Sequence, residues 1–492
     1  MNISAEKIFS SALMNMIDLV VTHDRFRDRA LKYADKKVYE KYVKINEDKR
    51  PIGTQLDKYT IIMNMLRAIA RSLQEKSITK QVRMGLLKAL AANVFLGGFD
   101  KIEEFNRRYG FLPPTFITIS PTKFCNLKCK GCYAISSKSS SEKLDYEILD
   151  RIITEKTELW GSHFTVVSGG EPFLYKSNGK TIIDLAREHN DNFFLVYTNG
   201  TIINENLAEK IAKVGNITPA ISVEGFEKET DERRGKGVHK KILRAFENLK
   251  NVGVPYGISV TAMRNNAELV VSDEFVDYYF GEKGAVYGWI FQYMPIGRGY
   301  TLDLVVTPEQ RLYMYRKTHE LIRNRGLFLV DFWNCGTISN GCISAGRGSG
   351  GYFYIDWNGN ATPCVFNPYS THNVIEVFKK GGTLNDIIIS PFFRAIREWE
   401  SDYSYEKPAT EMGNQIRQCA FRDHYNNMKN IIIENNAKPI DESGEEALKD
   451  ESYYKGMLEY DREFSNLVDP IWEKEYINPE RVKQTINSLN KI

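Results

Sequence analysis

Three cysteines lie within eight residues of the sequence. Cys125, Cys129 and Cys132 occur in CNLKCKGCYA, and only four more cysteines occur in the chain of 492 residues. Thiolates this close together can bind one small inorganic centre, but a tetrahedral zinc site or a cubane cluster takes four ligands. One coordination position is therefore open unless a distant residue fills it. A structural zinc knuckle, closed by a remote His or Cys, is the alternative.

A second group of cysteines follows much later in the chain. Its members are Cys335, Cys342, Cys364 and Cys419. The turn sequence DWNGN at 356–360 predicts a hairpin that carries Cys364 back towards Cys342, while Cys419 comes from a separate segment. Cys335 is the least certain ligand, because its thiol could instead pack among neighbouring aromatic rings. These spacings predict one further metal centre.

The fourth ligand of this second centre stays open at this point. Asp423 and His424 follow Cys419 closely in the sequence and are the alternatives to Cys335. A zinc site, or thiols that are only partly buried, is the other interpretation, because Cys and His ligands do not by themselves select the metal.

Composition limits the possible functions. The net charge of +3 gives no reason to expect a nucleic-acid partner. Glu6, Lys7 and Asp18 interrupt the apolar N-terminus, which predicts an amphipathic helix and not a signal peptide. The apolar run at 89–99 is too short to span a membrane, so we expect no transmembrane segment. The seven cysteines are odd in number and clustered, which favours metal binding over disulfides. A cytoplasmic location is therefore expected.

The remaining pattern divides the chain into four parts. Apolar residues at helical spacing predict a helical domain at 1–111. Six short β-branched or aromatic runs, at 116, 163, 193, 217, 256 and 286, then alternate with amphipathic stretches, which predicts parallel strands in a barrel or part-barrel at 112–305. A small cysteine-containing domain is expected at 306–430. A charged linker, around residue 441, and a C-terminal helical tail are expected at 431–492.

The first cysteine group resembles a known signature. A C-x3-C-x2-C loop followed by Tyr133, placed after the first strand of such a barrel, is similar to the signature of the radical S-adenosylmethionine (radical SAM) superfamily. The resemblance implies an α/β fold with a (β/α)6 partial TIM barrel. It also implies that Cys125, Cys129 and Cys132 bind a [4Fe–4S] cluster whose open iron is chelated by SAM.

Further motifs extend this resemblance along the strand ends. The sequence SGGEP at 168–172 is similar to the element that meets the SAM amino group, and Arg234 resembles an arginine that pairs with the SAM carboxylate. The residues implied in SAM binding are Tyr133, Gly169, Gly170, Glu171, Pro172, Asn199, Ser222, Glu224, Arg234 and Met294.

The second cysteine group is similar to the opening of the SPASM and twitch extensions, which bind auxiliary iron–sulfur clusters. Gly359 precedes Cys364 by five positions, as in their C-x(n)-G-x4-C pattern. The later cysteine run of a full SPASM domain is missing, which argues against two auxiliary clusters. The resemblance therefore implies one such cluster.

The function expected from the sequence is radical chemistry. An electron from the cluster would cleave SAM to a 5′-deoxyadenosyl radical that abstracts hydrogen from an unreactive carbon. The substrate would be a peptide, a protein or a hydrophobic small molecule. Lys123, Lys128 and Lys130 around the cysteine loop could form a docking face for flavodoxin or ferredoxin. A non-catalytic, zinc-stabilised interaction protein is the alternative.

Overall fold

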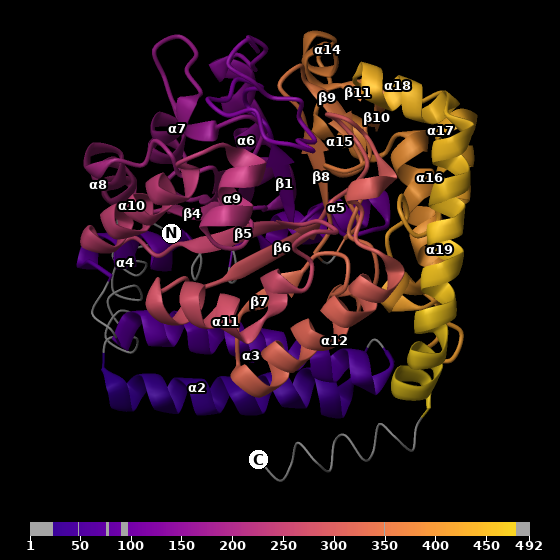
Figure 1. The fold of residues 1–492 in the computed structure, drawn as a ribbon, viewed down its shortest axis with the longest axis horizontal. Helices are drawn as coiled ribbons and strands as arrows, with labels where there is room; N and C mark the ends of the chain where they lie inside the picture. The colour runs from indigo at the N-terminus through magenta and orange to yellow at the C-terminus, as the bar shows by residue number, and fades with distance from the viewer. Residues whose placement is uncertain (1–22, 48, 75–77, 90–96, 349, 479–492) are drawn as a thin grey trace.

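The computed structural model describes residues 23–47, 49–74, 78–89, 97–348 and 350–478 (Figure 1). Its first part is helical, as the sequence predicts. The helices are α2 (Asp24–Tyr39), which continues into a π-helical turn η1 (Glu40–Ile45), α3 (Ile52–Gln74), α4 (Lys80–Leu86) and α5 (Phe99–Tyr109). The amphipathic helix expected at the N-terminus, most of the apolar run at 89–99 and the tail beyond 478 lie outside the described residues.

The six predicted strands are confirmed as parallel neighbours in one sheet. They are β1 (Phe116–Ile119), β2 (Phe164–Val167), β3 (Phe193–Thr198), β4 (Ile217–Val223), β5 (Gly257–Ala262) and β6 (Gly288–Gln292). Each strand pairs in parallel with the next. Strands β3 and β4 are buried along almost their whole length, because helices and loops cover both faces of a parallel sheet.

Helices connect these strands and pack their apolar sides on the sheet. They are α6 (Tyr146–Trp160), α7 (Ile182–Glu188), α8 (Glu205–Val214), α9 (Glu227–Arg234), α10 (Val238–Asn251) and α11 (Asp273–Val276). In α10, Ile242, Ala245, Phe246 and Leu249 are buried at helical spacing, while charged residues such as Arg244 and Glu247 lie between them. The carboxyl ends of the strands therefore meet at one edge of the sheet, where their loops can form a site.

Segments from the C-terminal half extend this sheet at both edges. The strands of this extension are β7 (Leu329–Asp331), β8 (Tyr352–Ile355), β9 (Asn360–Thr362) and β11 (His372–Asn373), whereas β10 (Tyr369–Ser370) and β12 (Lys438–Pro439) pair antiparallel in a separate two-stranded sheet. The order is β11-β9-β8-β1-β2-β3-β4-β5-β6-β7, with β8 parallel to β1 and β7 parallel to β6. The predicted hairpin through residues 356–360 is confirmed, because β8 and β9 pair antiparallel and Gly359 has φ +85°.

Later helices pack around this extension. They are α12 (Pro308–Arg325), α13 (Gly336–Ser339), α14 (Val374–Lys379), α15 (Leu384–Ile388), α16 (Pro391–Glu400) and α17 (Tyr425–Glu434). One continuous apolar core contains residues of the barrel strands and of α15, α16 and α17. The cysteine-containing region therefore shares its core with the barrel.

The expected charged linker is instead a helix, α18 (Glu442–Lys449). The Asp441 side chain accepts from the backbone N–H of Gly444, and Ala447 is buried, so a capped amphipathic turn forms where the charges suggested solvated chain. Figure 1 shows the following helix, α19 (Glu451–Trp472), running along one side of the molecule, before the π-helical turn η9 (Glu473–Ile477). None of the described helices combines the length and the apolarity needed to cross a membrane.

Candidate active site

The first cysteine loop follows β1 and is held by the loop after β2. The backbone N–H of Gly170 donates to the Thr122 carbonyl at 2.8 Å, and that of Glu171 donates to the Phe124 carbonyl at 2.9 Å. A Cβ atom on Gly170 would lie only 2.1 Å from the Phe124 carbonyl oxygen. Only glycine permits this approach, so the GGEP element positions the backbone just before Cys125.

The loop after β6 holds the other end of the cysteine loop. Arg298 donates its backbone N–H to the Cys132 carbonyl at 3.0 Å and its Nη1 to the Cys129 carbonyl at 2.6 Å. Gly297 has φ +70°, and a Cβ there would meet the Tyr133 carbonyl oxygen at 2.5 Å. Arg298 and its backbone contacts had no assigned role in the sequence pattern, because they depend on the return of β6 to this edge.

The three thiols of this loop differ in exposure. Cys125 is buried, whereas Cys129 and Cys132 are half-buried and line a cavity. The Cys125 sulfur accepts from the backbone N–H of Leu127 at 3.4 Å and from Asn199 Nδ2 at 3.7 Å. Burial raises the pKa of Cys125 to about 12. A cation at this position would favour the thiolate form of Cys125.

The carboxylate of Glu171 is fully buried beneath this loop. It accepts from Thr198 Oγ1 at 2.7 Å, from the backbone N–H of Asn199 at 2.8 Å and from that of Phe173 at 3.3 Å. Burial raises the pKa of Glu171 to about 7. The side chain therefore connects the loop after β2 to the end of β3.

An arginine pair meets a second buried carboxylate at the end of β4. Arg233 and Arg234 both pair with Glu224 Oε1, and the backbone N–H of Thr261 donates to Glu224 Oε2 at 3.1 Å. The backbone N–H of Lys130 donates to the Arg233 carbonyl at 3.1 Å. This cluster joins the ends of β4 and β5 to the cysteine loop.

A cavity of about 490 Å³ lies beside these groups and extends to the second cysteine group. Of the residues expected to bind SAM, seven line it: Tyr133, Gly169, Gly170, Asn199, Ser222, Arg234 and Met294. Glu171, Pro172 and Glu224 lie behind this surface. The Tyr133 hydroxyl bonds Ser168 Oγ at 2.8 Å and accepts from the Gly169 N–H at 3.1 Å.

The walls between the two cysteine groups are mostly aromatic and aliphatic. Aromatic rings from several strands face this space: Phe116, Phe164, Trp289, Phe291, Phe332 and Tyr352. Ile61 of α3 also reaches it, so the N-terminal helices help to close the cavity. The sequence alone did not connect these rings, because they come from β1, β2, β6, β8 and the segment after β7. Such a surface binds an apolar or aromatic group.

All four later cysteines also line this cavity. Cys342 precedes β8, Cys364 follows β9 and Cys419 follows a short 3-10 turn, Gln415–Arg417. Burial raises the pKa of Cys342, and the negative charges of Glu400, Cys419 and Cys364 raise it further. Cys335 lies apart from this interaction and packs with Ile61 and Ile322.

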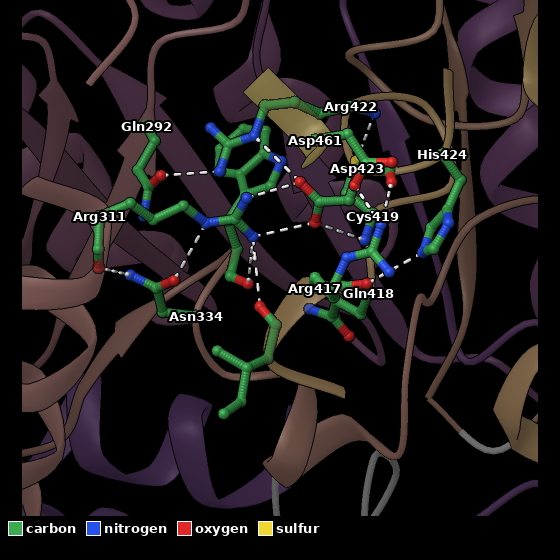
Figure 2. Close-up of polar contacts among 12 residues, drawn as sticks. Gln292, Arg311, Asn334, Arg417, Gln418, Cys419, Arg422, Asp423, His424 and Asp461 are labelled. Atoms are coloured by element: carbon green, nitrogen blue, oxygen red, sulfur yellow. Dashed lines mark hydrogen bonds and ion pairs between the residues drawn. The ribbon is translucent and has the colours of Figure 1, made fainter. Parts of the chain in front are cut away.

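A buried polar network positions Cys419 (Figure 2). Arg311 donates to Asp423 through Nη1 at 2.5 Å and Nη2 at 2.9 Å, and Asp423 Oδ2 accepts from the Cys419 backbone N–H at 3.1 Å. The Arg422 backbone N–H donates to the Cys419 sulfur at 3.3 Å, while its guanidinium donates to Gln292 Oε1 at 2.8 Å. The arginine at 311 is about a hundred residues away in sequence, and no local pattern identified it.

The described part of the chain was compared with the geometry of a site for a single metal ion. No group of three or more His, Cys, Asp or Glu side chains there is arranged to hold a single metal ion. A single tetrahedral ion needs its ligands about 2.0–2.3 Å from one point.

Comparison with known proteins finds matches that include the first cysteine loop. Residues 119–271 match the model of the Radical SAM superfamily. The mycofactocin maturase MftC of Mycolicibacterium smegmatis is 29% identical over 311 residues, which cover 61% of this chain and 76% of that protein. The AdoMet-dependent heme synthase of Methanosarcina barkeri is 24% identical over 291 residues, covering 54% of this chain and 80% of that protein.

A solved structure shares the fold. The crystal structure of Streptococcus suis SuiB bound to the precursor peptide SuiA aligns with a TM-score of 0.50 and 18% identity, covering 73% of this chain and 88% of that one. The matched segment contains the cysteine loop, the SGGEP element and the arginine pair at the end of β4. Residues 119–271 of this enzyme therefore form a radical SAM domain.

Proposed function

We propose that this enzyme abstracts a hydrogen atom from an apolar or aromatic group of its substrate, held in the cavity between the two cysteine groups. The observation that carries the proposal is that one cavity contacts both groups and has aromatic walls between them. A group placed there would be screened from water by Trp289, Phe291 and Phe332, which suits radical chemistry that water would quench.

The cofactors of this superfamily are a [4Fe–4S] cluster and SAM. Cys125, Cys129 and Cys132 would hold the cluster and leave one iron open for SAM. Together these cofactors supply a 5′-deoxyadenosyl radical when the cluster is reduced. Residues of the chain then have only to bind and orient the reactants.

The chain's residues divide this work by position. Asn199, Ser222 and Met294 lie on the cavity wall where they can contact SAM. Arg234 would pair with the SAM carboxylate while Glu224 holds its guanidinium in place. Glu171 supports the loop from below, through its bonds to Thr198 and Asn199.

The second cysteine group would bind one auxiliary iron–sulfur cluster. Cys342, Cys364 and Cys419 all line the cavity, although they come from three separate segments, and this supports the proposal. A cluster there would lie across the bound substrate from SAM. It could accept the electron that a substrate radical gives up, or it could contact the substrate directly.

A peptide side chain is the substrate class that we favour. The relative MftC is named a maturase, and it matches this chain over more than half of its length. An apolar side chain, Val, Ile, Phe or Tyr, would fit walls of this composition. The partners of this chain would then be SAM, a peptide and an electron donor such as flavodoxin or ferredoxin, for which exposed Lys128 and Lys130 offer a basic contact.

A tetrapyrrole is a second candidate substrate. The similarity to the heme synthase of Methanosarcina barkeri favours it, and planar rings stack well on aromatic walls. The two substrates can be distinguished by binding. Coproporphyrin III, used as a probe, should leave the tryptophan fluorescence of the enzyme unchanged if the cavity takes only a side chain.

Activity tests the core of the proposal. Anaerobically reconstituted enzyme should cleave SAM to 5′-deoxyadenosine with dithionite, and the triple change of Cys125, Cys129 and Cys132 to Ala should abolish this while the chain stays folded. Cys335→Ala is the matched control, because it removes a thiol outside that loop. Zinc in place of iron, together with no SAM cleavage by the wild type, would support the non-catalytic alternative.

A further inference from the structure

A buried carboxylate lies beside the second cysteine group. Glu400 is the last residue of α16 and is only 3% exposed. Its Oε1 accepts from Ser344 Oγ at 2.7 Å, and Ser344 Oγ in turn accepts from the Cys342 thiol at 3.4 Å. Two hydrogen bonds therefore connect this carboxylate to a cysteine of the group.

The second oxygen of this carboxylate is buried as well. Glu400 Oε2 is buried and unbonded among the residues that the structure describes. Burying a carboxylate in this state is costly unless a cation or a donor compensates it. The unbonded oxygen thus points to a ligand that the protein atoms do not supply.

Two nearby arginines do not fill this role. Arg347 donates to the Asn340 carbonyl at 3.0 Å and the Ser339 carbonyl at 2.6 Å. Arg397 donates to the Ala345 and Ile388 carbonyls, both at 2.8 Å. Their positive charges favour the ionised form of Glu400 from a distance. Within the described chain, however, their guanidinium groups form no ion pair with it.

We propose that Glu400 is the fourth protein ligand of the auxiliary iron–sulfur cluster, binding through Oε2 the iron that Cys342, Cys364 and Cys419 leave open. This inference rests on the auxiliary cluster of the proposed function. The hydrogen bond from Ser344 holds Oε1, which leaves Oε2 as the oxygen available to an iron. In a cluster held this way, one iron has an oxygen ligand from the protein and the other three irons have cysteine sulfur ligands.

The alternative ligands are committed elsewhere. Cys335 packs with Ile61 and Ile322, away from the Cys342 thiol. Asp423 is bound to Arg311 through both of its oxygens. His424 Nε2 lies 3.1 Å from the Arg417 carbonyl and so has its own partner. Glu400 is the carboxylate that combines burial, a free oxygen and contact with the cysteine group.

Ligation would make one iron chemically distinct. A carboxylate is a harder ligand than a thiolate and holds iron less firmly in an iron–sulfur cluster. The oxygen-ligated iron should be lost first on mild oxidation, leaving a three-iron cluster. That iron could contact the substrate directly only if the carboxylate moves away from it.

The test uses the full chain with Cys125, Cys129 and Cys132 changed to Ala, so that the auxiliary cluster gives the only iron signal. In protein labelled with ¹³C at its glutamate carboxyl groups, pulsed electron paramagnetic resonance of the reduced cluster should detect a ¹³C coupling. This measurement needs no change at position 400, so it does not depend on how a variant folds.

Two variants then identify the residue. Glu400→Gln should abolish the coupling and lower the iron content by about one atom per cluster. Glu398→Gln, at an exposed position of the same helix, should preserve both. A normal cluster without ¹³C coupling, or a coupling that survives in Glu400→Gln, would overturn the role of Glu400 alone. Absence of any cluster in the labelled protein would overturn the auxiliary cluster itself.

Discussion

Gly170 offers a sharp test of how the first cluster site is positioned. Its backbone angle lies outside the left-handed region, so alanine can adopt the same conformation without strain. Only the added methyl group changes the structure. That Cβ would lie 2.1 Å from the Phe124 carbonyl oxygen and 2.7 Å from the Lys123 carbonyl oxygen.

The size of the expected shift follows from these contacts. Ordinary contacts of a Cβ atom begin at 3.4 Å, so the cysteine loop would have to move by about 1.3 Å at Phe124. Overpacking of this kind costs about 1–3 kcal/mol of stability. The consequence for ligation is larger, because Cys125 is the next residue and a metal site tolerates displacements of only about 0.5 Å.

We therefore expect Gly170→Ala to fold but to bind the first cluster poorly. The assay is iron and sulfide content after anaerobic reconstitution, in protein whose Cys342, Cys364 and Cys419 are changed to Ala, followed by SAM cleavage in the otherwise native chain. Gly281→Ala is the control, because a Cβ there meets nothing within 4 Å. Native iron content and native SAM cleavage in Gly170→Ala would refute the reasoning.

Three further predictions concern buried charges. Arg234→Ala should weaken SAM binding by about 10- to 100-fold in calorimetry, because a charge-assisted bond is worth about 1.5–3 kcal/mol; unchanged affinity would remove Arg234 from the SAM site. Asp423→Asn should lower the free energy of unfolding by about 3–5 kcal/mol in denaturant titrations, because it leaves Arg311 buried and unpaired; a loss below 1 kcal/mol would contradict this. Burial lowers the pKa of Lys156 to about 7, so above that pH the unfolded chain binds more protons than the folded chain. The free energy of unfolding, compared with that of Lys156→Met, should therefore rise between pH 7 and 10 by up to about 1.4 kcal/mol per pH unit. A flat or falling difference between the two proteins over this range would contradict the burial argument.

The local pattern of the sequence determined much of the fold. All six barrel strands lie where short β-branched and aromatic runs predicted them, because a parallel strand buried on both faces must be apolar along its length. The hairpin at 356–360 followed from its turn residues in the same way. The charged stretch after 441 was misjudged, since its few apolar residues pack only because α19 and β12 provide a surface for them.

The sequence by itself also determined which residue types could do chemistry. Three cysteines in one short loop, followed by SGGEP after the next strand, predicted the first site before any geometry was known. The structure brings these two loops together through the bonds of Gly170 and Glu171 to Thr122 and Phe124, because they follow adjacent strands, so spacing along the chain reflects distance in space here.

Only the tertiary structure decided how distant groups combine. Glu400 reaches the second cysteine group from the end of α16, and Arg311 reaches Cys419 from α12, because both helices pack on the same core as β8. No local spacing encodes such a meeting. The aromatic walls of the cavity also combine side chains from strands that are neighbours in the sheet. The physical reason for both results is that the packing of a shared core, and not proximity along the chain, determines which side chains face one another.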